Sequence, residues 1–123
     1  MLEHEDLTER IIGCAIEVHC VLGPGLLESC YEVALAIEMA ERKIGFERQP
    51  VVSVPYKGRT VGQFRPDFIV ERTVILELKC VSRVDPVVQG QVLTYLKATG
   101  LKVGLFMNFH SPTLKDGLKR YAL

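Results

Sequence analysis

The spacing of apolar residues predicts two helices in the first third of the chain. Apolar positions recur at intervals of three and four within residues 7–21 and again within residues 26–43, which is the period of a helix with one buried face. Asp6 followed by Glu9 has the form of an N-terminal capping box. A Gly-Pro-Gly break separates the two helices, and Gly45 suits the C-terminal cap of the second.

The pattern then changes to the two-residue alternation of strands. Residues 51–56 alternate loosely, and Lys57-Gly58-Arg59 is typical of a hairpin turn, so a second strand is expected over residues 61–70. A third strand, residues 74–81, is almost continuously apolar. Such a run predicts a central strand that is covered on both faces.

The remaining residues predict a helix, a strand and a short final helix. Pro86 suits the first turn of a helix that ends at Gly100, residues 102–109 form a fourth strand, and residues 113–121 form the closing helix. The order is then α-α-β-β-β-α-β-α. It predicts an α/β or α+β fold in which helices flank a central mixed four-stranded sheet. The length predicts a single domain over residues 1–123.

Three charged residues interrupt the most apolar part of this pattern. Glu77 and Lys79 share one face of their strand because side chains alternate. Centring the preceding turn at Arg72 places Asp67 opposite Glu77, so two carboxylates and one ammonium meet on one sheet face. Burying a lone charge is costly, which leaves two interpretations: Lys79 neutralises a carboxylate in a salt bridge, or the carboxylates bind a divalent metal.

Composition narrows the function classes only slightly. Fifteen Lys and Arg residues balance fifteen Asp and Glu residues, which gives no support to non-specific nucleic-acid binding and does not exclude it. The apolar runs are far shorter than the ~20 residues that span a bilayer, and the first ten residues lack the layout of a signal peptide. We therefore expect a cytoplasmic protein with no membrane partner.

The cysteines form no C-x-x-C pair, which predicts reduced, mostly buried thiols rather than a zinc or iron–sulfur site. They are Cys14, Cys20, Cys30 and Cys80.

Three motifs together carry a resemblance to a known family. Pro66-Asp67, followed after nine residues by Glu77-Leu78-Lys79, resembles the core of the PD-(D/E)XK nuclease superfamily. Residues 25–31, GLLESCY, resemble the G-x-x-E-x-x-Y signature of the GxxExxY family, and residues 91–95, QVLTY, resemble the Q-x-x-x-Y motif of RecB-like nucleases. The resemblance extends from about residue 11 to residue 120.

The resemblance implies a restriction-endonuclease-like core and a metal-dependent nuclease, acting on DNA or less often RNA with Mg²⁺ or Mn²⁺. Asp67 and Glu77 would bind the metal directly, together with the backbone carbonyl of Leu78. Lys79 would orient or help deprotonate the attacking water and stabilise charge on the phosphate. Glu28 would point toward the metal and contact it directly or through water; a plain charge favoured by the helix dipole is the alternative.

The helical motif residues have a functional and a structural interpretation each. By resemblance, Gln91 reaches the metal or the scissile strand and Tyr95 supports it; packing against the sheet is the alternative. Tyr31 lies one turn beyond Glu28 and either packs in the core or holds Glu28 in place. The family pattern has a histidine where this chain has Val88.

Two hypotheses from other classes stand beside the nuclease. The chain could keep the nuclease fold and bind nucleic acid or a protein without cutting, or it could be a structural subunit of a larger complex. A homodimer or a protein partner is compatible with each hypothesis.

Overall fold

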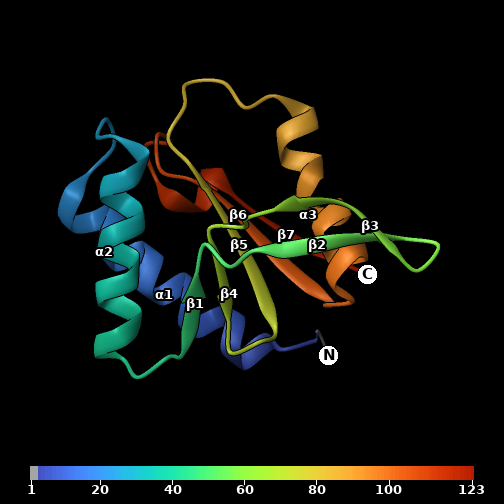
Figure 1. The fold of residues 1–123 in the computed structure, drawn as a ribbon. Coiled ribbons are helices and arrows are strands. Elements are labelled where there is room, and N and C mark those ends of the chain that lie inside the picture. Colours follow the sequence, from blue (N-terminus) through green and yellow to red (C-terminus); the bar gives the residue numbers. More distant parts are fainter. Residues whose placement is uncertain (1–2) are drawn as a thin grey trace.

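The computed structural model describes residues 3–123, and its helices and strands alternate in a mixed α+β order (Figure 1). The elements are α1 (Glu5–Leu22), α2 (Glu28–Glu41), β1 (Phe46–Arg48), β2 (Val52–Tyr56), β3 (Arg59–Phe64), β4 (Phe68–Val70), β5 (Val74–Lys79), α3 (Pro86–Thr99), β6 (Val103–Asn108), the 3₁₀ helix η1 (Leu114–Gly117) and β7 (Leu118–Ala122).

Three of the four predicted helices are confirmed, but two of their predicted caps are wrong. The residue before α1 is His4, which has a left-handed conformation and makes no side-chain cap, so Asp6 lies inside the first turn and forms no capping box. At the end of α2, Lys43 takes the left-handed conformation (φ 59°). Gly45 instead donates its N–H to the Glu71 carboxylate, so its role is to join β1 to the end of β4.

The central sheet is mixed, as predicted, but within residues 3–123 it has five strands rather than four. The strand order is β1-β4-β5-β6-β7, and β5 and β6 are parallel while the other pairs are antiparallel. Two of the five, β1 and β7, were not predicted and are the edge strands, while the strand predicted over residues 51–56 is β2 and lies outside this sheet. β1 is only three residues long, and β7 replaces the helix predicted over residues 113–121, of which only the 3₁₀ turn Leu114–Gly117 is helical.

The strand predicted over residues 61–70 is two strands in two sheets. Pro66 lies between β3 and β4, and a proline cannot donate to a ladder. β3 pairs with β2 in a separate two-stranded sheet, whereas β4 enters the central sheet. The chain therefore changes direction immediately before Asp67.

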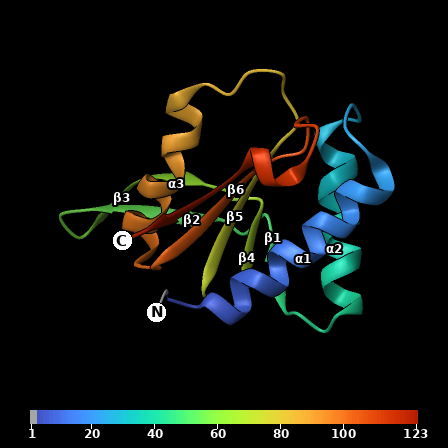
Figure 2. The same cartoon turned by 180° about the vertical axis from the view of Figure 1, so that it is seen from behind.

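Helices cover both faces of the central sheet (Figures 1 and 2). α1 and α2 lie on one face, where their apolar sides pack on the buried side chains of β4, β5 and β6. α3 covers the other face and lies so close to β6 that a Cβ on Gly104 would stand 2.4 Å from the Val92 side chain. The sheet is thus buried between two layers, as the continuous apolar run of β5 predicts.

Candidate active site at the start of β4 and the end of β5

The β4–β5 hairpin turns through two residues in the left-handed conformation. Glu71 and Arg72 have φ values of 51° and 54°, and the N–H of Thr73 donates to the carbonyl of Val70 over 2.9 Å. This geometry is a tight hairpin turn of the kind that matches the strand twist. Phe68 therefore pairs with Leu76, and the next residues along the two strands are Asp67 and Glu77.

Each of these two carboxylates accepts a hydrogen bond from the other strand. Glu77 Oε1 accepts from the N–H of Asp67 over 3.0 Å, and Asp67 Oδ2 accepts from the N–H of Leu78 over 2.7 Å. The predicted alignment of Asp67 with Glu77 is thereby confirmed. The side chains take the place of ladder bonds where regular pairing ends.

Burial makes both carboxyl groups weaker acids than usual, and nearby negative charges add to the effect, so both keep their protons to unusually high pH. Burial raises the pKa of Asp67 to about 6, and the charges of Glu32 and Glu28 add to the rise. Burial, followed by the charge of Asp67, raises the pKa of Glu77 to about 8. Lys79 lowers both pKa values, but its effect is smaller than that of burial.

Lys79 lies beside the pair and is matched by Glu28. Its Nζ stands 4.0 Å from Glu28 Oε1, and its side chain is 31% exposed. Glu28 is the first residue of α2, so the start of that helix points its carboxylate at the end of β5. The ion pair that the strand pattern allowed between Lys79 and Asp67 or Glu77 forms with Glu28 instead.

Tyr31 is a core residue that also holds the loop before Glu28. Its hydroxyl donates to the carbonyl of Gly23 and accepts from the N–H of Leu26 over 3.1 Å, while its buried ring stacks on Phe109. Gly25 in this loop has φ 101°, a conformation that favours glycine. In the G-x-x-E-x-x-Y motif, the glycine thus allows the turn and the glutamate begins the helix. The tyrosine holds the loop through its hydrogen bonds.

Tyr95 lies near the carboxylate pair, and Gln91 contacts Tyr95. Burial raises the pKa of Tyr95, and the charges of Glu77 and Asp67 add to the rise. The hydroxyl donates to Gln91 Oε1 over 3.3 Å. Gln91 itself is exposed, so the structure connects it to the cluster through the tyrosine.

A protein-family model described as the PD-(D/E)XK nuclease superfamily matches residues 5–121. The chain belongs to this superfamily. No curated protein matches the sequence significantly. Among solved structures, the protein is similar to an alkaline exonuclease from Laribacter hongkongensis, with a TM-score of 0.54 and 16% sequence identity. The match covers 99% of this chain and 72% of the exonuclease chain. At this identity the likeness shows a shared fold.

The donor set of this superfamily protein fits a divalent cation. Two hard oxygen ligands lie on adjacent strand ends, and the repulsion between them that raises the pKa of Glu77 is relieved by a bound positive charge. Within residues 3–123, no three acidic, histidine or cysteine side chains converge into a complete metal cage. Mg²⁺ usually takes one or two carboxylates from the protein and fills its remaining coordination positions with water and phosphate. The Asp67–Glu77 pair supplies that number of carboxylate ligands.

A buried ion pair behind Asp67 was not foreseen from the sequence. Glu32 is only 7% exposed; its carboxylate accepts from Arg48 over 3.0 Å and from the Gln49 side chain over 3.1 Å. The N–H of Gln49 also donates to the carbonyl of Asp67 over 2.9 Å. The available signal was spacing, since Glu32 lies four residues after Glu28 on one helix face.

Asn108 is a second positioning residue that the sequence did not reveal. Its side-chain amide donates to the carbonyl of Val81 over 2.9 Å and accepts from the N–H of the same residue over 3.1 Å. Next to it, the N–H of Phe109 donates to the carbonyl of Lys79 over 2.8 Å. These bonds fix the chain as it leaves β5, immediately after the lysine.

The thiols are free, as predicted, but they are less buried than predicted: Cys14 is buried, Cys80 is half-buried, and Cys20 and Cys30 are exposed. None of the helices within residues 3–123 combines the length and apolarity that crossing a bilayer requires.

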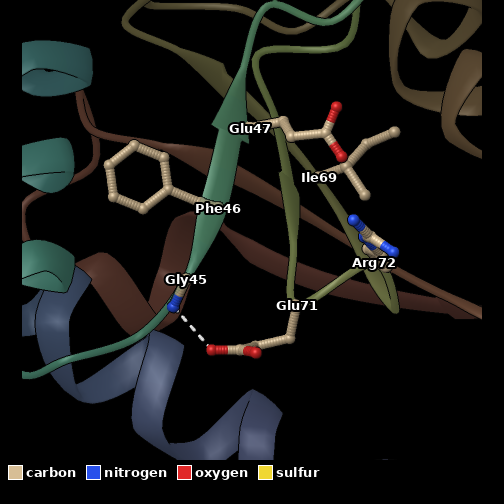
Figure 3. A pocket seen from close by; sticks show the side chains of 6 residues that line it. All are labelled: Gly45, Phe46, Glu47, Ile69, Glu71 and Arg72. Atoms are coloured by element: carbon tan, nitrogen blue, oxygen red, sulfur yellow. Dashed lines mark hydrogen bonds between the residues drawn. The ribbon is translucent and has the colours of Figure 1, made fainter.

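A separate hollow of about 340 Å³ lies at the far end of β4, away from Asp67. Figure 3 shows the hydrogen bond between the Gly45 N–H and Glu71 at its edge, with Phe46 pointing away from Glu47 across β1. No predicted site residue lines it. Its lining residues are Gly45, Phe46, Glu47, Ile69, Glu71 and Arg72.

Proposed function

We propose that this superfamily protein is a metal-dependent nuclease that hydrolyses phosphodiester bonds in DNA or, less favoured, RNA. The observation that carries the proposal is the Asp67–Glu77 pair, which is aligned across two strands with Lys79 beside it. The G-x-x-E-x-x-Y residues support placing the chain in the narrower GxxExxY family. Balanced charge and free thiols are compatible with a cytoplasmic location.

Asp67 and Glu77 would hold Mg²⁺ or Mn²⁺, with the backbone carbonyl of Leu78 and the Glu28 carboxylate as further ligands, the latter directly or through water. When bound, such an ion polarises the scissile phosphate and lowers the pKa of a bound water. Lys79 would orient that water and stabilise negative charge on the phosphate. Gln91 and Tyr95 would hold the scissile strand.

Cation binding should release protons, which gives a direct test of the carboxylate pair. With the pKa of Glu77 raised to about 8, the carboxyl is largely protonated at pH 7 and must lose its proton to become a ligand. Calorimetry with Mn²⁺ in buffers of different ionisation enthalpy should therefore report a release approaching one proton. Asp67→Ala should abolish binding; equal binding by wild type and variant would exclude this site.

Cleavage is tested on single-stranded, duplex, flapped and branched DNA and on RNA. Lys79→Ala should remove activity, whereas Lys102→Ala, which removes an exposed lysine just before β6, should not. Activity that survives in Lys79→Ala would assign cutting to a contaminant or to another site.

One observation favours an alternative, a module that binds nucleic acid or a protein without cutting. Val88 lines the same hollow as Lys79, at the position where the family pattern has a histidine, and valine can neither donate nor accept a proton. Under this alternative, the wild type binds DNA without cutting it, and Val88→His introduces cleavage. Cleavage by the wild type excludes the alternative.

A further inference from the structure

The β2–β3 hairpin, here called the arm (residues 50–66), carries positively charged side chains and no acidic ones. Residues 50–66 contain Lys57, Arg59 and Arg65 and no Asp or Glu, although the whole chain is neutral. None of the ion pairs within residues 3–123 involves these three residues. Their charge is therefore available to a partner.

The arm projects from the body and is exposed over most of its length. In Figures 1 and 2 the β2–β3 turn lies far from the central sheet, while α3 lies against the base of the arm. Every residue of β3 except Phe64 is exposed. Tyr56, next to the turn, is 61% exposed, an unusual position for an aromatic ring that has no partner beyond Lys57, whose Nζ is 5.4 Å from the ring centroid.

One face of the arm leads to the carboxylate cluster. Tyr56 pairs with Arg59 and Val52 pairs with Phe64, with one register shift between Val54 and Pro55. Val52 and Tyr56 are four residues apart on β2, so they and their cross-strand partners share a face. At the base, the Phe64 ring stacks on Tyr95 with centroids 4.1 Å apart and planes 7° apart. Phe64 ends β3 and lies three residues before Asp67 along the chain, so the base of the arm lies next to the cluster.

We propose that this face of the β2–β3 arm binds the single strand of nucleic acid that enters or leaves the carboxylate cluster. Lys57 and Arg59 contact phosphates, and the Tyr56 ring stacks on a base. A single strand is favoured over a duplex because an exposed ring can stack only on a base that is free of its neighbours. The inference rests on the proposed nuclease function and adds where the substrate lies.

The length of the arm sets the length of strand that it can contact. Along β2, the Val52–Phe64 pair and the Tyr56–Arg59 pair are four residues apart, or about 13 Å at ~3.3 Å per residue. Nucleotides that stack at about 3.4 Å each span this distance with roughly four nucleotides. Oligonucleotides of about eight nucleotides should therefore bind more tightly than those of about four, which cannot cover both the cluster and the tip.

The test measures binding apart from cutting, by fluorescence anisotropy of labelled oligothymidylate in EDTA. Lys57→Ala/Arg59→Ala should weaken binding about tenfold and reduce the slope of log affinity against log salt by about 1.4, since each single-strand phosphate contact contributes ~0.7. Tyr56→Ala should weaken binding roughly tenfold with an unchanged slope, and Tyr56→Phe should retain it.

The matched control is Lys43→Asn/Lys102→Ala, which removes two exposed lysines outside the arm. Asparagine is chosen at position 43 because it tolerates the left-handed conformation that Lys43 adopts. It should bind like the wild type. If the wild type binds and cuts while the arm variants match it in affinity and slope, the inference is refuted and the nuclease stands. If the wild type binds no nucleic acid, the substrate class fails and the inference fails with it.

Discussion

Glu77→Gln should remove a pH dependence of stability that the carboxylate pair builds into the metal-free protein. The pKa of Glu77 is raised from its ordinary value of 4.5 to about 8. Between these two values the folded chain keeps a proton that the unfolded chain has already lost. The free energy of unfolding therefore falls as pH rises from about 5 to 8. Asp67, with its pKa raised from 3.8 to about 6, adds a fall in the same direction at lower pH.

The magnitude follows from the two pKa values of Glu77. Each pH unit in which one state is protonated and the other is not changes stability by about 1.4 kcal/mol. Allowing for partial titration at both ends, the wild type should lose roughly 3 kcal/mol between pH 5 and pH 8 through this group. Glutamine cannot ionise, and its side-chain oxygen can still accept the hydrogen bond from the N–H of Asp67.

The assay is urea unfolding in EDTA at pH 5, 6, 7 and 8. At pH 5 the variant and the wild type should be about equally stable; at pH 8 the variant should be more stable by roughly 3 kcal/mol. Glu47→Gln, which removes an exposed carboxylate on β1, should keep the wild-type slope. Parallel slopes for wild type and Glu77→Gln would refute the reasoning. When Mn²⁺ replaces EDTA in the assay, it should stabilise the wild type at pH 8 and leave Glu77→Gln unchanged.

Three further predictions concern positioning and packing. Asn108→Ala removes three hydrogen bonds at a buried position and should cost roughly 2–4 kcal/mol in urea unfolding. Gly104→Ala drives a methyl group into Val92 and should lower stability by about 1–3 kcal/mol, whereas Gly90→Ala, which meets nothing, should not lower it. Tyr31→Phe removes two hydrogen bonds to the loop before α2 and should cost about 1–2 kcal/mol; cleavage, measured below the melting range, should fall severalfold.

The core strands could be predicted from the sequence because their signals are local. β5 is an unbroken apolar run, and the short polar turn before it fixes which residues face each other, so Asp67 and Glu77 could be aligned without a structure. β7 could not, because LKRYA has little apolar periodicity and becomes a strand by pairing with β6. β1 has a single apolar residue in three.

The site shows the same division. The carboxylate pair was visible because Glu77 and Lys79 interrupt an apolar strand and the short turn places Asp67 opposite Glu77. Glu32 was not, because its partners Arg48 and Gln49 are 16 and 17 residues away and only the fold brings them together. The Asn108 side chain hydrogen-bonds to backbone groups 27 residues away. Such a long-range bond leaves no pattern in the sequence around Asn108.

The tight turn at Glu71 and Arg72 makes the site sensitive to chain length rather than to chain composition. Many substitutions of Arg72 should be accepted, and glycine, which adopts this conformation more easily, should even be favourable there. Glu71 is less tolerant, because its carboxylate also accepts the hydrogen bond from the Gly45 N–H. One added or deleted residue is different, because it shifts β4 against β5 by a single position and turns alternate side chains to the other face. Asp67 and Glu77 would then face opposite layers, in a chain whose composition had hardly changed. In a library of variants of this protein, single-residue insertions and deletions between positions 67 and 77 should therefore be rarer among active clones than substitutions at the same sites.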